Sequence, residues 1–400
     1  MKIVKRAFSA LIISCMTLAI AGILAFYVLI VAGASPRLQT IWICSAMRTM
    51  SHKYLATMFF TDDYIDSIMK ANEIDDSGYD SEILSFGNKE TETETEVESE
   101  TETEFETETE SEAESEIETE IESESESETE TETETETEKL AYSVEDDQIP
   151  ELENGESDYI SEGYEELEDG LYLKEVSGST WRGYVMLIED PLRVKLVDTS
   201  QQYICGENVM TMVKNAGAVA GINGGGFQDG ANYDSNGGMP AGLLIENSEI
   251  VYPYVIDNTV YNMIGINDEG ALVLRHCTAE WALQNNIVSA VSFSPFLVVN
   301  GEGLIKNGTG GWGIAPRTAI GQRKTGEFLF LVIDGRQADW SIGCDLDVLQ
   351  NVMLEEKAYN AAMLDGGSST AMVYNSEYVN RPSLGHERWI NNCFAVMPKQ

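Results

Sequence analysis

Apolar residues are concentrated in one long run near the start of the chain. Residues 7–34 are almost entirely apolar and uncharged, and they follow the cations Lys2, Lys5 and Arg6. About 20 helical residues cross the apolar core of a bilayer, whereas the apolar part of a signal peptide has only about 7–15 residues. The pattern therefore predicts that residues 1–34 form a basic cytoplasmic tip and an uncleaved transmembrane signal anchor.

The charges beside this run predict its orientation. Cations next to an apolar helix stay in the cytoplasm, so the rest of the chain should lie outside the cell. We therefore expect a single-pass protein of the cell membrane with an extracellular C-terminal domain. A cleaved signal peptide is the alternative, because Ala32-Gly33-Ala34 could serve as a cleavage site.

Residues 35–88 are predicted to form a juxtamembrane segment. Aromatic and aliphatic side chains are mixed with scattered charges between residues 35 and 72. This pattern fits an amphipathic segment on the outer face of the membrane. It fits a short helical spacer or a dimer contact equally well, and the sequence leaves the three alternatives open.

A strictly alternating acidic repeat follows. Glutamate occupies all 25 even positions from 90 to 138, mostly between Thr and Ser residues, and no Lys or Arg interrupts it. Alternation alone would suggest a strand, but the like charges repel and almost no apolar surface is available for burial. Residues 89–170 are therefore predicted to be a disordered, low-complexity acidic linker. We expect it to act as a spacer; calcium collection is the alternative, and O-glycosylation of its hydroxyl groups stays open.

Residues 171–400 have the composition of a globular domain, and about 230 residues are enough for a sizeable core. Asn267 and Gly270 mark a hairpin turn, and Thr278 and Asp345 are candidate helix caps. Strand-like runs dominate and helices are interleaved among them, which predicts an α+β domain built on a mixed, mainly β-sheet structure. The predicted strands cover residues 184–188, 193–197, 243–245, 263–266, 272–274, 292–299, 328–333 and 371–374, and the predicted helices cover 207–216, 278–286 and a segment after 345.

Net charge and cysteine content exclude several classes of function. The formal net charge is −45, and no basic stripe appears, so nucleic-acid binding is not expected. Six cysteines without a CxxC pair and three histidines argue against a structural zinc site. No metal site and no required cofactor is predicted, although the many Asp and Asn residues are compatible with a structural calcium ion. Four cysteines in the globular part could form one or two disulfides outside the cell or remain buried thiols: Cys205, Cys277, Cys344 and Cys393.

Four polar junctions follow or begin apolar strand-like runs, and each could carry chemistry. The first is AGINGGGF at residues 220–227, where Asn223 and Gly224 begin a polar, glycine-rich run. Consecutive glycines let backbone N–H groups approach a ligand closely. The run is not a Walker loop, because no Gly-Lys-Ser/Thr follows. A tight turn without a ligand is the alternative interpretation.

The second and third junctions combine cations with an acid. PRTAIG at residues 316–321 places Arg317 and Thr318 at the mouth of an apolar strand, where an arginine suits a bidentate grip on phosphate. LFLVIDGR at residues 329–336 ends a strand with Asp334 and Arg336, which point to the same side if the chain stays extended. An ordinary strand-end turn with a surface ion pair is the alternative for the third junction.

The fourth junction, AAMLDGGSSTAMV at residues 361–373, is the most informative. Asp365 follows an apolar run and precedes two glycines and three hydroxyl side chains. Adjacent hydroxyls and flexible N–H groups can form a cradle for phosphate or sugar oxygens. This junction therefore predicts a binding site for a phosphorylated or sugar ligand.

Taken in order, the four motifs resemble the phosphodiester glycosidase family. The similarity extends over about residues 183–398 and includes Arg381-Pro382-Ser383 and Glu387-Arg388 near the end. The fourth motif is the most specific of the set. Bacterial members of this family are often associated with exopolysaccharide or cell-wall polymers.

The resemblance implies an extracellular hydrolase that cleaves the bond between a sugar C1 and a phosphodiester oxygen. The expected substrate is a phosphorylated glycan or cell-wall polymer with an N-acetylglucosamine-type sugar. Cations and N–H groups would hold the phosphate, and carboxylates would support an oxocarbenium-like sugar and activate water or attack directly. We expect Asp365 to be the more critical catalytic carboxylate and Asp334 to be its partner. The residues expected to bind phosphate or substrate are Arg317, Thr318, Arg336, Asn223, Gly224, Gly366, Gly367, Ser368, Ser369 and Arg388.

Two other functions compete with this interpretation. A non-catalytic phosphoglycan-binding module would be favoured by loss of a carboxylate, yet Asp334 and Asp365 are both present. A metal-dependent phosphodiesterase would cleave the P–O bond, but such enzymes usually need clustered His and Asp ligands, and the motifs are poor in His. His386, next to Glu387 and Arg388, could be a proton shuttle or a structural residue.

Overall fold

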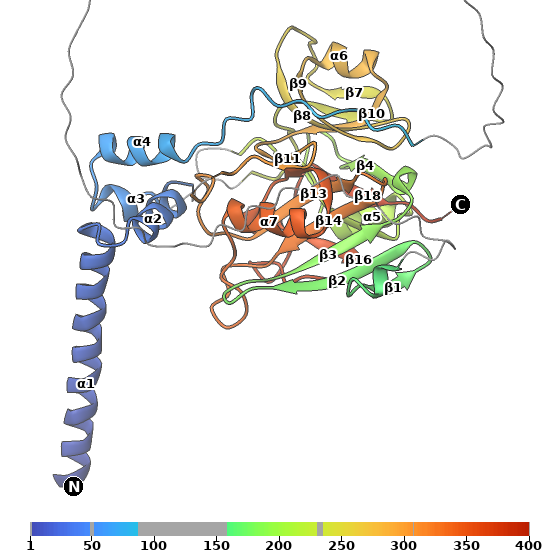
Figure 1. The fold of residues 1–400 in the computed structure, drawn as a ribbon. Coiled ribbons are helices and arrows are strands. Elements are labelled where there is room, and N and C mark those ends of the chain that lie inside the picture. The colour runs from blue at the N-terminus through green and yellow to red at the C-terminus, as the bar shows by residue number, and fades with distance from the viewer. Residues whose placement is uncertain (1, 49–51, 87–157, 230–234, 307, 400) are drawn as a thin grey trace, which may run out of the picture. The chain divides into compact units, whose positions relative to one another are not determined.

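A computed structural model describes residues 2–48, 52–86, 158–229, 235–306 and 308–399 (Figure 1). Most of the predicted acidic linker, residues 89–157, therefore lies outside the described residues. The C-terminal domain includes the short 3-10 helix Asp158–Ile160, and Tyr159 and Tyr164 are already buried in its core. The folded domain thus begins before residue 171, the boundary that composition predicted.

The chain starts with helix α1 (Lys2–Phe26), which continues as a π-helical segment (Tyr27–Val31). Within it, Leu11–Val31 is long and apolar enough to cross a membrane. A signal sequence near the N-terminus has the same length and composition. The helix therefore fits both alternatives that the sequence left open, an anchor and a signal peptide.

Three short helices follow and share a small core of their own. They are α2 (Pro36–Arg48), α3 (Tyr54–Thr57) and α4 (Asp62–Ala71). Their apolar faces meet at Ile43, Ala46, Ala56 and Ile65, which are all buried. Thr61 caps α4 by accepting a hydrogen bond from the N–H of Tyr64 at 3.4 Å. The mixed pattern of residues 35–72 is thus explained by a small helical cluster.

Residues 73–86, here called the strap, run from this cluster along the C-terminal domain (Figure 1). The N–H of Ser81 donates to the carbonyl of Leu274 at 2.9 Å. The N–H of Glu82 donates to Oδ1 of Asn300 at 2.8 Å. These contacts attach the strap to the C-terminal domain by its backbone, and both belong to one compact unit of the chain.

The C-terminal domain contains three sheets, and every strand pair in them is antiparallel. The eight-stranded sheet has the order β1-β2-β3-β14-β13-β15-β11-β12. Its strands are β1 (Glu165–Glu168), β2 (Leu171–Ser177), β3 (Arg182–Ile188), β11 (Phe296–Val299), β12 (Glu302–Gly303), β13 (Arg317–Arg323), β14 (Phe328–Ile333) and β15 (Ala358–Met363).

The two smaller sheets have five strands each, in the orders β7-β6-β10-β8-β9 and β17-β16-β5-β18-β4. The first contains β6 (Leu244–Glu246), β7 (Glu249–Tyr252), β8 (Tyr261–Asn267), β9 (Leu272–Cys277) and β10 (Ile287–Ser292). The second contains β4 (Val194–Asp198), β5 (Ala220–Asn223), β16 (Met372–Tyr374), β17 (Glu377–Tyr378) and β18 (Asn392–Val396). The described helices of the domain are α5 (Val209–Asn215), α6 (Ala279–Gln284) and α7 (Leu346–Glu355), with short 3-10 turns at Pro191–Arg193 and Gly367–Ser369.

One hydrophobic core joins the three sheets. Phe330 of the eight-stranded sheet, Ile264 of the second sheet and Phe394 of the third belong to the same buried cluster. Because the sheets share this core, the end of β15 is held beside the end of β5. The mainly β architecture with interleaved helices confirms the predicted α+β class.

One predicted strand is divided in two. The apolar run at residues 292–299 predicted a continuous strand, but β10 ends at Ser292 and β11 starts at Phe296. The two strands belong to different sheets. Pro295 has no N–H to donate to a sheet ladder, which explains why the run is interrupted at this point.

A pair of carboxyl groups joins β4 to β6 and makes stability depend on pH. The N–H of Asp198 donates to Oε1 of Glu246 at 3.3 Å. Burial, followed by repulsion from Asp198, raises the pKa of Glu246 to about 7. The folded protein therefore binds this proton more tightly than the unfolded chain does. The stabilisation that the protonated Glu246 carboxyl group gives is complete below about pH 4.3 and is lost as the pH rises through about 7.

We expect Glu246→Gln to stabilise the protein at high pH. The amide cannot ionise, so the free energy of unfolding should rise by roughly 1–3 kcal/mol at pH 8 and change little at pH 4.5. Thermal unfolding at the two pH values measures the difference. Glu249→Gln, at an exposed position of the same hairpin, is the matched control. Equal gains at both pH values would contradict this role of Glu246.

Candidate functional site

The backbone fixes Asp365 where the eight-stranded sheet meets the third sheet. On one side, the N–H of Leu364 donates to the carbonyl of Thr318 at 2.9 Å. On the other, the N–H of Asp365 donates to the carbonyl of Gly224 at 3.1 Å. Asp365 therefore sits at the end of β15, between β13 and the glycine-rich turn after β5, so two of the four motifs directly flank the fourth.

The side chain of Asn223 holds this junction together. Its Nδ2 donates to the carbonyl of Asp365 at 2.6 Å. Its Oδ1 accepts from Oγ1 of Thr318 at 2.7 Å and from the N–H of Ala371 at 3.1 Å. Asn223 and Thr318 are both fully buried. The structure therefore places these two predicted binding residues behind Asp365, where they orient it.

The glycines of the first and fourth motifs allow close backbone approach. A Cβ on Gly224 would lie 2.0 Å from Oδ1 of Asn392, so only glycine fits there. Gly367 has a positive φ of 64°, and its N–H donates to the carbonyl of Pro316 at 2.9 Å. The N–H groups of Gly224 and Gly225 donate to Asn392, at 3.0 and 2.8 Å. These three N–H groups therefore bind protein atoms.

The carboxylate of Asp365 has an unusual electrostatic setting. Desolvation raises its pKa to about 6. A hydrogen bond from Ser369 and the charge of Arg388 act in the opposite direction, whereas Asp229 adds to the increase. Ser369 is buried, and Ser368 is partly exposed. A carboxyl group with a pKa near neutrality is suited to exchange protons during a reaction.

Arg388 is held by an acid that the sequence did not single out. Its Nη2 lies 2.6 Å from both carboxylate oxygens of Asp229, and its guanidinium lies 4.7 Å from the centre of the Phe227 ring. Phe227 and Asp229 come directly after the glycine-rich turn. Asp229 and Arg388 are 159 residues apart along the chain, so no local pattern pairs them. The one sign of their role in the sequence is that Phe227 and Asp229 lie next to the glycine-rich turn.

Arg336 is the second cation near Asp365. It has a positive φ of 61° directly after β14, and its side chain is exposed. A Cβ on Gly367 would lie 3.1 Å from its Nη2, which places the guanidinium over the turn that follows Asp365. Desolvation lowers the pKa of Arg336, and the charge of Asp365 opposes that change. Arg336 therefore lies beside the turn that follows Asp365, and its positive φ shows that the chain does not stay extended past Asp334.

Arg317 lies elsewhere than expected. Its Nη2 donates to the carbonyls of Trp312 and Gly313 at 3.1 and 2.6 Å, and its Nε donates to the carbonyl of Cys344 at 3.3 Å. The side chain is buried, and burial lowers its pKa to about 10. Arg317 therefore fastens two loops behind the site, because its Nε and Nη2 donate to backbone carbonyls and its Nη1 contacts the sulfur of Met363.

Asp334 also has a different surrounding from the predicted one. Its carboxylate accepts hydrogen bonds from Nε1 of Trp340 at 2.8 Å, from Nδ2 of Asn380 at 2.9 Å and from the N–H of Arg381 at 3.0 and 3.2 Å. Desolvation raises the pKa of Asp334, and these hydrogen bonds act against the increase. The structure thus pairs Asp334 with the loop at residues 380–381, and it shows no contact between the two predicted catalytic carboxylates.

The residues around His386 divide into exposed and buried groups. His386 is exposed, whereas the neighbouring Glu387 is buried. Glu387 accepts a hydrogen bond from the N–H of Met210 at 3.4 Å, and desolvation raises its pKa to about 7. Because Glu387 accepts this hydrogen bond at the start of α5, it attaches the loop that carries Arg388 to that helix.

The structure contains free thiols at all six cysteines. Cys277, Cys344 and Cys393 are buried, as expected for thiols that act as small apolar residues. Within the described ranges, no three His, Cys, Asp or Glu side chains gather closely enough to hold a metal ion.

Comparisons with known proteins agree with the motifs. The family model described as phosphodiester glycosidase matches residues 216–397, a range that contains the sites of all four motifs. YomE, an uncharacterised SPbeta prophage-derived protein of Bacillus subtilis (strain 168), is 26% identical over 213 residues. That match covers 50% of this chain and 32% of YomE, so the chain spans about a third of that relative's length.

Two solved structures are similar to this chain. The catalytic domain of zebrafish N-acetylglucosamine-1-phosphodiester alpha-N-acetylglucosaminidase, auto-inhibited by its pro-peptide, is 22% identical with a TM-score of 0.48. The match covers 59% of this chain and 86% of that one. A protein of Burkholderia pseudomallei K96243 described as exported is 17% identical with a TM-score of 0.44, covering 55% of this chain and 74% of that one.

Proposed function

We propose that residues 216–397, which match the family model described as phosphodiester glycosidase, form a domain that hydrolyses the bond between a sugar C1 and a phosphate oxygen. The observation that carries the proposal is the position of Asp365 at the junction of two sheets, with Arg336 and Arg388 beside it. A carboxylate next to two cations suits a substrate that combines a sugar with a phosphate anion.

In the proposed reaction, an oxygen nucleophile forms a bond to C1 while the bond from C1 to the phosphate oxygen breaks. The electron pair stays on that oxygen, so the products are a free sugar and a phosphomonoester. Asp365 takes the proton of the attacking water, or it attacks C1 and the glycosyl-enzyme is then hydrolysed. A phosphate leaving group needs little protonation, which is why one carboxylate at the sugar is sufficient.

The surrounding residues supply binding and orientation. Arg336 and Arg388 neutralise the phosphate, and Asp229 holds Arg388 in place. Asn223 and Thr318 fix the backbone at Asp365, and Ser369 orients its carboxylate. Asp334, Asn380 and Arg381 form a positioning network for the adjacent loop. Arg317 likewise positions a neighbouring loop, because its Nη2 donates to the carbonyl of Gly313.

We propose a cell-surface location for this activity. The apolar N-terminal helix would anchor the chain. The acidic residues would not act as the spacer between membrane and domain that the sequence suggested, because the strap that precedes them is already bonded to the C-terminal domain. The substrate would be a phosphorylated glycan or cell-wall polymer outside the cell. An N-acetylglucosamine-type sugar is the first sugar to test.

The pH dependence of the reaction should follow Asp365. Its pKa is raised to about 6, and a base or nucleophile must be unprotonated. We therefore expect kcat/KM to be constant above about pH 6 and to fall about tenfold per pH unit below it. Glu387→Gln is the control, because the pKa of Glu387 is also raised, to about 7. Activity that increases below pH 6 would contradict the assigned role.

Product identification tests the proposed function. The full-length protein in detergent micelles is incubated with the methyl phosphodiester of N-acetylglucosamine-1-phosphate, with and without EDTA, and products are identified by mass spectrometry. Free N-acetylglucosamine, formed with or without EDTA and absent with Asp365→Asn, is the expected result. N-acetylglucosamine-1-phosphate would indicate P–O cleavage. Tight binding of several diesters without turnover would identify a binding module instead.

A further inference from the structure

Helix α2 packs against a glycine-rich loop that leads directly into β13. The loop covers residues 308–314 and has the sequence GTGGWGI. The hydroxyl of Ser45 accepts a hydrogen bond from the N–H of Ile314 at 3.0 Å. Nε of Arg48 donates to the carbonyl of Gly311 at 3.3 Å. Two side chains of α2 therefore hold the backbone of this loop at two points.

The loop approaches the helical cluster so closely that no side chain fits between them. Gly313 has a positive φ of 64°, and a Cβ on it would lie 2.4 Å from both the backbone nitrogen and Oγ of Ser45. Gly311 has a positive φ of 73°, and its Cβ would lie 2.8 Å from the carbonyl oxygen of Asn72, at the end of α4. Both features require glycine. The sequence of the loop is therefore fitted to the helices that it contacts.

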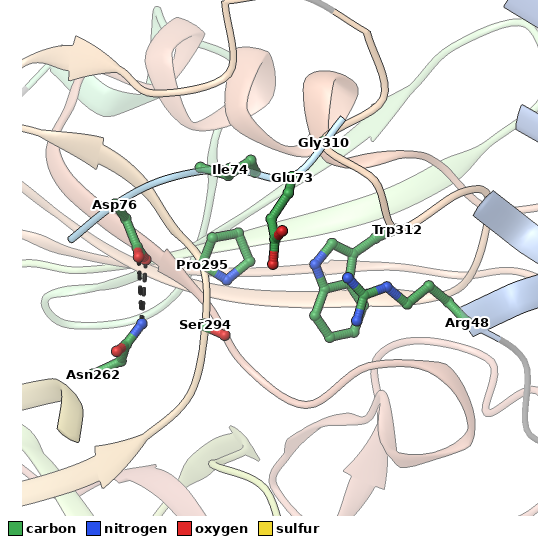
Figure 2. Close-up of a pocket in the computed structure, with 9 residues that line it drawn as sticks. All are labelled: Arg48, Glu73, Ile74, Asp76, Asn262, Ser294, Pro295, Gly310 and Trp312. Carbon is green, nitrogen blue, oxygen red and sulfur yellow. Dashed lines mark hydrogen bonds between the residues drawn. The ribbon is translucent and has the colours of Figure 1, made fainter. Parts of the chain in front are cut away.

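An aromatic contact adds to these hydrogen bonds. Figure 2 shows the guanidinium of Arg48 against the indole of Trp312, at 4.6 Å from the centre of the ring, an arrangement that stabilises a cation on an aromatic face. The two side chains line a cavity of about 270 Å³, so close packing does not hold the loop on this side. The carbonyl of Trp312 accepts from Nη2 of Arg317 at 3.1 Å. Trp312 thus links α2 to the start of β13.

The end of the loop contacts the turn that follows Asp365. The carbonyl of Pro316 accepts from the N–H of Gly367 at 2.9 Å, and a Cβ on Gly366 would lie 2.9 Å from the same oxygen. The backbone of Gly366 is in turn hydrogen-bonded to the carboxylate of Asp365. Because each step is a direct contact, a shift of the loop would reach Asp365 through Pro316 and this turn.

We propose that α2 helps to build the active site, and that Ser45 and Arg48 are positioning residues. Through the backbone of residues 311–316 they hold the turn at Gly366 and Gly367 against the catalytic carboxylate. The proposal rests on the proposed function, because it assumes that Asp365 carries out the chemistry. It gives the helical cluster a part in catalysis, although neither side chain touches the substrate.

Kinetics of the double variant Ser45→Ala/Arg48→Ala test the proposal. Full-length protein in detergent micelles is assayed with the methyl phosphodiester of N-acetylglucosamine-1-phosphate. A small displacement of a catalytic group is costly, so kcat should fall about tenfold. KM should change by less than about twofold, because the positioning residues do not bind the substrate. Lys70→Ala, which removes an exposed cation from α4 of the same cluster, is the matched control and should behave as wild type.

The pH profile separates positioning from a general loss of stability. Desolvation raises the pKa of Asp365 to about 6, and the hydrogen bond from the backbone of Gly366 opposes that increase. Loosening the turn should therefore raise this pKa further and move the fall in kcat/KM to higher pH. Arg48→Lys keeps a cation at Trp312 and should retain most of the wild-type kcat. Unchanged kcat and pH profile in the double variant, or a fall in kcat that thermal unfolding accounts for, would overturn the proposal.

Hydrogen exchange separates this proposal from the hydrolytic function. The backbone amides of residues 364–370 should exchange about tenfold faster in the double variant than in the wild type, as followed by mass spectrometry, whether or not any diester is hydrolysed. The amides of β14 should exchange at the wild-type rate. If no diester turns over but this exchange pattern holds, only the hydrolytic function fails. Unchanged exchange at residues 364–370 would contradict the positioning role, even if kcat fell.

Discussion

Replacing Asp365 with asparagine should lower kcat/KM by at least about a hundredfold. The amide keeps the size of the side chain, and the backbone hydrogen bonds of residues 364 and 365 are unaffected. An amide, however, cannot accept the proton of water or attack C1. Because desolvation raises the pKa of Asp365 to about 6, loss of the charge should not destabilise the protein at neutral pH.

A loss of activity without a loss of stability separates a catalytic role of Asp365 from a structural one. Hydrolysis rates and thermal unfolding are measured on the same preparation of Asp365→Asn. Asp268→Asn, at an exposed turn position between β8 and β9, is the matched control and should retain full activity. Full activity of Asp365→Asn would refute the assignment, and a loss of activity that parallels unfolding would make Asp365 a structural residue.

Replacing Asp334 with alanine should destabilise the fold by roughly 3–5 kcal/mol, because it leaves one buried and two partly buried donors without their acceptor. The donors are Nε1 of Trp340, Nδ2 of Asn380 and the N–H of Arg381. Arg381 also stacks on Trp340 at 3.8 Å, so the whole loop should loosen. Chemical denaturation at pH 7 measures the change in the free energy of unfolding.

Asp339→Ala supplies the control for this experiment, since Asp339 is exposed on the same loop. It should unfold like the wild type. The activity of Asp334→Ala is measured at a temperature where the variant remains folded, and a modest rise in KM is expected from the displaced loop. Unchanged stability with a large fall in kcat would instead make Asp334 the catalytic partner that the sequence suggested.

Local features of the chain were predictable from sequence. The cap at Asp345 depends on neighbours only, and its carboxylate accepts from the N–H of Val348 at 3.1 Å as expected. The turn at residues 267–270 likewise forms between β8 and β9. The importance of Asp365 could be inferred because the acid, the two glycines and the hydroxyls are contiguous.

Roles that depend on tertiary contacts could not be predicted in this way. A cation at the mouth of a strand suggested a phosphate ligand for Arg317, but the loops that supply its acceptors are separated from it by up to 27 residues. The partner of Arg388 is 159 residues away, and its identity required the fold.

The most direct test of the central claim is the site of oxygen incorporation from labelled water. Wild-type protein hydrolyses the methyl diester of N-acetylglucosamine-1-phosphate in H₂¹⁸O, and both products are analysed by mass spectrometry at early times, before the free sugar exchanges its C1 oxygen. The account predicts ¹⁸O in the sugar and none in methyl phosphate, because the C1–O bond breaks. Label in the phosphate product would show cleavage at phosphorus and would contradict the assignment of Asp365 to chemistry at the sugar.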